Sequence, residues 1–310
     1  MRIVFCGTPD VAVPSLDALV ASRHEVVAVV TRPDAPSGRG KRLSASPVAE
    51  RAAALGLETL KPRRPRDDDF VERLTEIAPD CCPVVAYGAL LPQRVLDIPP
   101  RGFVNLHFSV LPRWRGAAPV QHAVLAGDET TGATSFRIVL ELDAGPTFDV
   151  VTEPIGPTDT SGDLLTRLAY SGSNLLVRTL DAIEAGAQPV PQPEQGVTLA
   201  PKIAVEQAAV DWSQPATVID RLVRACSPNP GAWTTFRGER FKIGSATPVE
   251  GTLPPGALEI TRRSVRVGTA AGLVELGQVQ AQGKRPMAAA DWARGIGAAA
   301  GEPGSIHLGV

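Results

Sequence analysis

The chain has 310 residues, of which 44% are hydrophobic and 21% are charged, and its formal net charge is −2. This length exceeds what a single hydrophobic core usually fills, so we expect a globular protein with two domains. No apolar run approaches the roughly 20 residues that cross a bilayer, which argues against a membrane protein. The near-neutral charge disfavours a dedicated nucleic-acid-binding protein.

The first residues, the cysteines and the histidines lead to three further expectations. The first residues enter a strand-like run without the parts of a secretory signal, which predicts a cytoplasmic protein. Four cysteines are too few for a disulfide scaffold and are expected to be reduced thiols in the core. The four histidines show no metal-ligand spacing, so no metal site is expected.

Strand-like and helix-like segments alternate through the first half of the chain. Expected strands cover residues 2–6, 25–31, 57–60, 81–87 and 104–107, and expected helices begin near residues 9, 47 and 68. Thr8 is expected to cap the first helix, with Pro9 at its first position, and Ser46 to cap the second. The alternation predicts an α/β fold with right-handed crossovers and a doubly wound, mostly parallel sheet.

Two further strands, over 134–140 and 148–154, are expected to be antiparallel at one edge, followed by a helix over 161–183. A polar, proline-rich stretch then predicts an extended linker. Beyond it, a helix over 216–225 precedes short strands over 232–236, 240–244, 264–268 and 272–279, a pattern typical of a small β-barrel. The expected division is a catalytic domain over 1–188, a linker over 189–204 and a β-barrel domain over 205–310.

The most informative residues follow the buried strand predicted near residue 104. Asn105 and His107 are two positions apart, so their side chains point to the same face at the carboxyl end of that strand, where open parallel sheets bind ligands. Asp143 falls in a turn after the next strand, where its carboxylate can meet the imidazole. A base, a residue that orients it and an amide donor for an oxyanion together predict acyl-type transfer to an amine or to water.

Other motifs are absent or open to two interpretations. The turn after the first strand lacks the glycines of a dinucleotide fingerprint, which disfavours nicotinamide binding, and no P-loop or nucleophile elbow is present. Arg39, Lys41 and Arg42 form a basic loop that is either simply solvated or grips a phosphate backbone. Trp114 is either a core aromatic residue or a stacking platform.

The run from Asn105 to Gln121, NLHFSVLPRWRGAAPVQ, resembles the hallmark of the folate-dependent formyltransferases. Four further motifs match in order, so the resemblance covers essentially the whole chain; they are GTPD at 7–10, GRGK at 38–41, VAYG at 85–88 and LDAG at 142–145. The Asn-x-His pair and the later Asp indicate transfer from 10-formyltetrahydrofolate. The RWRGAAP run and the basic loop indicate the members of the family that act on methionyl initiator tRNA.

The resemblance implies roles for particular residues. Asn105, His107 and Asp143 would be catalytic. The Rossmann-like domain would bind 10-formyltetrahydrofolate as formyl donor through Tyr87, Gly88, Ser109, Val110, Leu111 and Pro112. Arg39, Lys41 and Arg42 would bind the tRNA, and a C-terminal barrel of the oligonucleotide-binding type would help to hold it. No metal or nicotinamide cofactor and no membrane partner is implied, and a monomer is expected.

Three positions depart from the usual pattern of the family. Phe108 stands where the family commonly has glycine or proline, and its bulky ring is expected to narrow or reshape the folate entrance. Glu141 replaces a glycine, and Pro146 removes a backbone donor. The alternative function is formyl transfer to an amino sugar nucleotide or another small amine. A binding module without catalysis is a further alternative, against which the retained catalytic residues argue.

Overall fold

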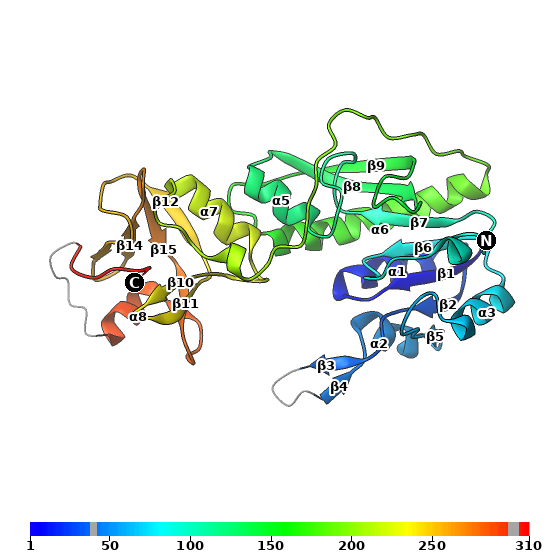
Figure 1. Cartoon of the computed structure of the whole chain (residues 1–310), viewed down its shortest axis with the longest axis horizontal. Helices are drawn as coiled ribbons and strands as arrows, with labels where there is room; N and C mark the ends of the chain where they lie inside the picture. Colours follow the sequence, from blue (N-terminus) through cyan, green and yellow to red (C-terminus); the bar gives the residue numbers. More distant parts are fainter. Residues whose placement is uncertain (38–41, 297–303, 310) are drawn as a thin grey trace. The chain divides into compact units, whose positions relative to one another are not determined.

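The computed structural model of the chain describes residues 1–37, 42–296 and 304–309 (Figure 1). These residues form two compact units. The N-terminal unit comprises Met1–Pro119, Thr130–Pro154 and Leu165–Ala200, and the C-terminal unit comprises Val120–Glu129, Ile155–Leu164 and Pro201–Val310. No described helix has the length and apolar character that crossing a membrane requires.

A seven-stranded sheet forms the centre of the N-terminal unit. In spatial order its strands are β5 (Glu58–Leu60), β2 (Glu25–Val30), β1 (Arg2–Gly7), β6 (Cys82–Val85), β7 (Phe103–His107), β8 (Thr130–Arg137) and β9 (Thr147–Pro154). The first five run parallel, and β8 and β9 are antiparallel. The order reverses between β1 and β6, which confirms the predicted doubly wound sheet with an antiparallel edge.

One expected strand is displaced in the structure. The strand predicted over 134–140 begins four residues earlier and ends at Arg137. The apolar residues that follow, including Leu140 and Leu142, are exposed in a turn. The predicted end of the strand was therefore wrong, because it was inferred from apolar residues that lie in an exposed turn and not in the core.

Helices cover the sheet, and their starts test two predicted caps. They are α1 (Val13–Val20), α2 (Pro47–Ala54), α3 (Asp68–Ile77), α4 (Gln93–Leu96) and most of α6 (Ser161–Glu184). Ser46 caps α2, since its hydroxyl accepts from the Ala49 amide at 3.1 Å. The Thr8 prediction is wrong: a 3-10 turn (Asp10–Ala12) precedes α1, and the Thr8 hydroxyl instead donates to the Tyr87 carbonyl at 2.8 Å. That bond joins the loops that follow β1 and β6.

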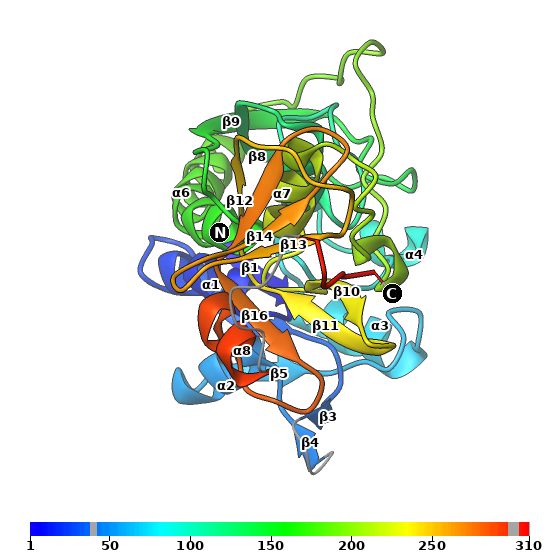
Figure 2. The same cartoon turned by 90° about the vertical axis from the view of Figure 1, so that its left-hand side faces the viewer.

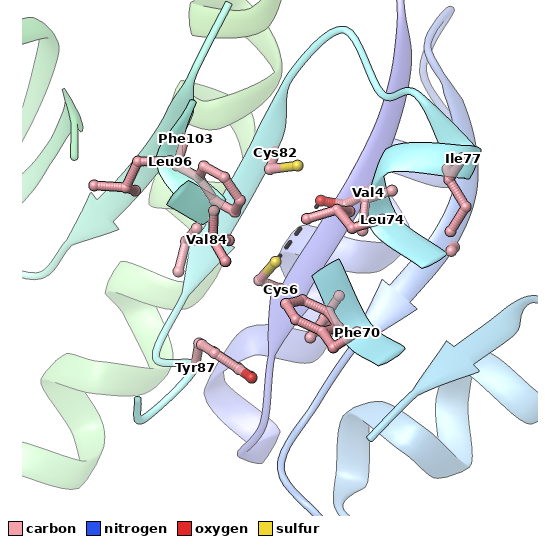
Figure 3. Packing of buried hydrophobic residues seen from close by; sticks show 13 residues of the cluster. Val4, Cys6, Phe70, Leu74, Ile77, Cys82, Val84, Tyr87, Leu96 and Phe103 are labelled. Atoms are coloured by element: carbon pink, nitrogen blue, oxygen red, sulfur yellow. Dashed lines mark hydrogen bonds between the residues drawn. The ribbon is translucent and has the colours of Figure 1, made fainter. Parts of the chain in front are cut away.

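One face of the sheet packs against α3 and α4 in a buried cluster (Figure 3). Phe70 and Leu74 of α3 lie over Val4 and Cys6 of β1, and Val95 and Leu96 of α4 complete the layer. Burial of such apolar side chains contributes about 25 cal/mol for each Å² removed from water, so this layer holds the strand ends in fixed positions.

All four cysteines are free and buried, which confirms the predicted core thiols. Burial is the main cause of a raised thiol pKa at each of them, to about 12 for Cys81 and about 11 for Cys226. These thiols therefore stay protonated at neutral pH.

The opposite face of the sheet packs against α6. A Cβ at Gly172 of α6 would lie 2.9 Å from a methyl carbon of Leu106, so the helix approaches β7 closely. Farther along, the hydroxyls of Thr179 and Ser135 hydrogen-bond at 2.7 Å. Leu106 therefore faces α6, and its neighbours on β7 face the other side of the sheet.

The C-terminal unit contains two four-stranded antiparallel sheets (Figure 2). One comprises β10 (Ala232–Phe236), β11 (Glu239–Ile243), β16 (Gln278–Ala281) and β17 (Met287–Ala288), and the other β12 (Ala246–Val249), β15 (Leu273–Leu276), β14 (Val265–Gly268) and β13 (Leu258–Ile260). The chain passes from one sheet to the other at Gly244 and Gly277. There the Gly244 amide donates to the Gln278 carbonyl, and the Gly277 amide donates to the Ser245 carbonyl. This continuity agrees with the predicted small barrel.

Three α-helices of the described residues lie wholly or mostly in the C-terminal unit. They are α5 (Pro119–Ala126), α7 (Ala216–Ala225) and α8 (Ala289–Gly295). The bounds of α7 match the prediction, and α7 packs against β12 and β15. The predicted strand over 272–279 is interrupted at Gly277, where a Cβ would meet the Ser245 hydroxyl at 2.4 Å. The chain turns there from β15 into β16.

Candidate active site

Strand β7 places two polar side chains on one face of the sheet. Asn105 pairs with Phe136 of β8 and His107 with Thr134, two positions apart in an unbroken register. Asn105 is half-buried, and His107 is buried with its side chain 6% exposed. Because Leu106 faces α6, Asn105 and His107 point together to the face away from that helix, as the sequence predicts.

His107 is held between two loops. Its Nε2 lies 2.8 Å from the Trp114 carbonyl oxygen, and because a carbonyl only accepts, Nε2 carries the hydrogen. Its Nδ1 lies 3.6 Å from Oδ2 of Asp143, whose side chain is 12% exposed. The ring also meets Phe136 edge-on, with the ring centroids 6.3 Å apart. The structure thus brings His107 and Asp143 together as predicted.

Burial lowers the pKa of His107, while the Asp143 carboxylate and the bond to the Trp114 carbonyl act in the opposite direction. The neutral ring therefore has its lone pair on Nδ1, toward Asp143. A proton taken up at Nδ1 would convert the 3.6 Å contact into an ion pair. This arrangement suits a general base whose protonated form is stabilised by a neighbouring carboxylate.

The loop after β7 is tied down by short bonds. Ser109 is buried, and its hydroxyl donates to the Arg113 carbonyl at 2.6 Å. The Thr134 hydroxyl donates to the Ser109 carbonyl at 2.7 Å and accepts from the Leu111 amide at 3.2 Å. Trp114 has a φ of +64°, an unusual backbone conformation for a large residue, which aims its carbonyl at His107.

The remaining residues of the predicted folate site follow β6 and β7. Gly88 is exposed with a φ of +83°, Val110 is 36% exposed, and Pro112 is half-buried. Tyr87 belongs to the core cluster, where burial raises the pKa of its phenol to about 12 (Figure 3). Phe108 is 7% exposed, so its ring is packed inside the unit.

The basic loop lies largely outside the described residues. Arg39 and Lys41 are not among them, and Arg42 begins the short strand β4 (Arg42–Ser44), which pairs with β3 (Ala35–Ser37). This hairpin follows β2 and brackets the predicted tRNA-binding loop.

Asp143 sits in a turn with its own supports. Its φ is +50°, and its Oδ2 accepts a hydrogen bond from the Gly116 amide at 2.8 Å. A cavity of about 560 Å³ opens beside this turn, with Arg115, Glu141, Ala144, Pro146 and Gln192 in its wall. The turn thus places the carboxylate between the Gly116 amide and His107.

The turn that contains Asp143 can pack closely against the end of β8 only because residue 145 is a glycine. A Cβ there would lie 1.7 Å from the Arg137 carbonyl oxygen, so Gly145→Ala forces the turn to move. We expect the free energy of unfolding to fall by about 1–3 kcal/mol, as for other overpacked sites, and activity to fall with it. Urea unfolding measures the first effect. Gly295→Ala, whose Cβ meets nothing within 4 Å, is the control, and equal stability of the two variants would contradict the expectation.

Residues 190–200, which we call the strap, run alongside both loops of the site. The strap pairs with the loop after β7 at Arg115 and Leu199, and the Trp114 amide donates to the Thr198 hydroxyl oxygen at 2.9 Å. Gln192 contacts the Asp143 turn. The sequence shows only a polar, proline-rich stretch here, and no motif in it signals these contacts.

A separate group of polar side chains lies at the start of β2. His24, Asp181 and Glu184 have ligand atoms within 4.8 Å of one another. Arg23 pairs with both carboxylates, and the Met1 amino group lies 3.0 Å from Glu184. These charges neutralise the carboxylates, so the group acts as an ion-pair cluster between β2 and α6.

Comparison with known proteins identifies the class to which this fold and site belong. The formyl transferase family model matches residues 1–180, and the model of the formyl transferase C-terminal domain matches residues 202–297. The chain belongs to the formyl transferase family, and within it to the methionyl-tRNA formyltransferases. A methionyl-tRNA formyltransferase of Streptomyces avermitilis is 66% identical over 98% of this chain and 99% of its own length.

Solved structures share the fold at low sequence identity. HypX from Aquifex aeolicus, in complex with tetrahydrofolic acid, matches with a TM-score of 0.66 and 21% identity over 94% of this chain and 47% of HypX. An N-formyltransferase from Helicobacter canadensis, in complex with folinic acid and dTDP-3-aminofucose, matches with a TM-score of 0.67 and 15% identity over 90% of this chain and all of its own.

Proposed function

We propose that this chain transfers the formyl group of 10-formyltetrahydrofolate to the amino group of methionine esterified to initiator tRNA. The products are N-formylmethionyl-tRNA and tetrahydrofolate. Identity of 66% to a methionyl-tRNA formyltransferase supports the substrate, and two structures with this fold hold folates. The observation that carries the chemistry is the pairing of His107 Nδ1 with the Asp143 carboxylate at 3.6 Å, beside Asn105 on the same strand.

In the proposed mechanism the methionyl amine attacks the formyl carbon. The Asn105 amide donates to the oxygen that becomes negative, a contribution worth roughly 3 kcal/mol at other sites of this kind. His107 takes the proton that the amine loses, and Asp143 stabilises the resulting imidazolium. Collapse of the tetrahedral intermediate then breaks the bond to N10 of the folate, and this nitrogen receives a proton.

The folate is assigned to the loops that follow β6, β7 and β8. Ala89 and Ile138, from the loops after β6 and β8, pack against the same core cluster, whereas Leu90, Leu140 and Leu142 remain exposed. Exposed large apolar side chains beside convergent polar groups are typical of a ligand site. We assign Gly88 and residues 109–112 to this site, with Tyr87 supporting it from the core.

We assign the basic loop and the C-terminal unit to binding of the tRNA. Neutralising Arg39, Lys41 and Arg42 together is expected to raise the KM for methionyl-tRNA by about 10-fold or more, because phosphate contacts dominate affinity for nucleic acids. The dependence of binding on salt should weaken by about 2 to 3 in the slope of log K against log salt concentration. Transfer assays at several salt concentrations measure both, and unchanged tRNA kinetics would return the loop to a purely solvated role.

Single-turnover transfer tests the substrate directly. Methionyl initiator tRNA should be formylated rapidly, and a dTDP-linked amino sugar should not. Transfer to the sugar with none to the tRNA would establish the alternative function, for which the fold of the Helicobacter canadensis enzyme is a precedent. Folate binding without transfer to either amine would favour a binding module.

A further inference from the structure

The side-chain amide of Gln192, in the strap, hydrogen-bonds to both loops of the active site. Its Oε1 accepts two hydrogen bonds from Arg115, from Nε at 3.1 Å and from Nη2 at 2.8 Å. Its Nε2 donates to the carbonyls of Asp143 and Gly145, each at 2.8 Å. An amide nitrogen has two hydrogens, so both donors of Gln192 hold the Asp143 turn.

The Asp143 turn needs such support because of its backbone. A residue other than glycine adopts a φ of +50° only at an energetic cost relative to an ordinary conformation, because its Cβ crowds the backbone there. The two bonds from Gln192 hold the carbonyls on either side of Ala144 in this turn. In this turn, the Asp143 carboxylate reaches both the Gly116 amide and the His107 ring.

The acceptor side of Gln192 reaches the other loop. Arg115 directly follows Trp114, whose carbonyl binds His107 Nε2. Arg115 is itself nearly buried, with its side chain 12% exposed, and Nη1 lies 3.5 Å from Glu141. A single amide therefore links the loop that holds one nitrogen of His107 to the turn that faces the other.

We propose that Gln192 is a positioning residue that fixes the Asp143 carboxylate against His107 and so controls the rate of formyl transfer. The proposal rests on the proposed function and adds to it a residue from the segment between the two family-model matches. Gln192 acts through Asp143 and Arg115.

Two variants separate the parts of this role. Gln192→Met keeps the size of the side chain and loses every hydrogen bond, whereas Gln192→Glu keeps the acceptor for Arg115 and places an oxygen against two carbonyls. We expect kcat to fall about 10- to 100-fold in both, because small displacements of catalytic groups have effects of this size, with each KM within about twofold. Gln195→Met, at an exposed position of the same strap, is the control and should behave as wild type.

The pKa of His107 provides a second test of this role. Asp143 raises the pKa of His107 against the effect of burial, so a displaced carboxylate lowers that pKa further. We expect NMR titration of the imidazole to show a lower pKa in Gln192→Met and no change in Gln195→Met. This measurement needs no substrate, so it tests the positioning role even if wild-type protein fails to formylate tRNA, which would instead refute the proposed function.

Several outcomes would overturn the proposal. They are an unchanged kcat in Gln192→Met, a loss in KM alone, recovery of kcat in Gln192→Glu, or an unchanged pKa of His107 in Gln192→Met. Urea unfolding of each variant identifies general destabilisation. If Gln192→Met unfolds under the assay conditions, the kcat of Gln192→Glu tests the positioning role instead, because this variant retains the hydrogen bonds to Arg115.

Discussion

Replacing His107 with alanine is expected to lower the single-turnover rate of formyl transfer by about 10²- to 10⁴-fold, the range that a positioned acid–base group contributes. The physical reason is that Nδ1 is the atom available to take the proton from the attacking amine, since Nε2 donates to the Trp114 carbonyl. Rapid-quench assays with formyl-labelled folate and methionyl initiator tRNA measure the rate directly.

The His107→Ala variant should still bind both substrates. The fluorescence or calorimetric Kd for a folate is expected to remain close to that of wild type, which separates loss of chemistry from loss of the site. His122→Ala provides the control, because His122 lies on α5 and contacts the Pro201 carbonyl. If His107→Ala retained more than a tenth of the wild-type rate, His107 would have no acid–base role.

Asp143→Asn is expected to reduce the rate by about 10²-fold or more while leaving the turn intact. The asparagine oxygen can still accept from the Gly116 amide, so the geometry is preserved and only the charge is lost. Without that charge the imidazolium of His107 has no ion-pair partner in the turn, as in other sites where a carboxylate orients a catalytic histidine.

The pH dependence of the same variant has a definite sign. Burial lowers the pKa of His107, and Asp143 partly offsets that effect, so Asp143→Asn lowers the pKa further. Since the neutral ring is the base, the acidic limb of the kcat profile should move to lower pH, within the range of about 5 to 8 where histidine titrates. Asp149→Asn, on exposed β9, should leave the profile unchanged. A shift to higher pH in Asp143→Asn would contradict the assigned interaction.

The fold could be predicted to a large extent because its elements differ in periodicity. Buried strands of the parallel sheet are short apolar runs between turns, α3 begins at the predicted residue, and α7 was placed at its correct bounds. Errors occurred where local chemistry allows two outcomes. Thr8 is a suitable cap by type, but its hydroxyl has a competing acceptor in Tyr87, which is 79 residues away in the sequence.

The common orientation of Asn105 and His107 could also be predicted, for a related reason. The two-residue spacing of Asn105 and His107 fixes their common face. The contact with Asp143 depends on more than spacing, because β8 passes His107 first and ends beside Val104, so the turn after β8 reaches His107 only by folding back along β7. The spacing does not predict which nitrogen of His107 faces Asp143. That depends on the Trp114 carbonyl and on a positive φ, for which the sequence shows no signal.

The strap was the least predictable part of the site. Its composition is that of a linker, because glutamine, proline and glycine favour neither helix nor strand. Its conformation is set by bonds to Arg115, Trp114 and the Asp143 turn, which are distant in sequence. The domain boundaries at residues 188 and 204 remain a prediction.

Because its thiols are buried, the folded protein should react very slowly with thiol-modifying reagents. Alkylating agents attack exposed thiolates, and all four native cysteines are buried and protonated. A cysteine introduced at Leu43, which is 73% exposed on β4 beside the basic loop, would therefore be the preferred point of labelling. A dye attached there could report the arrival of tRNA in the unmodified background of the natural sequence.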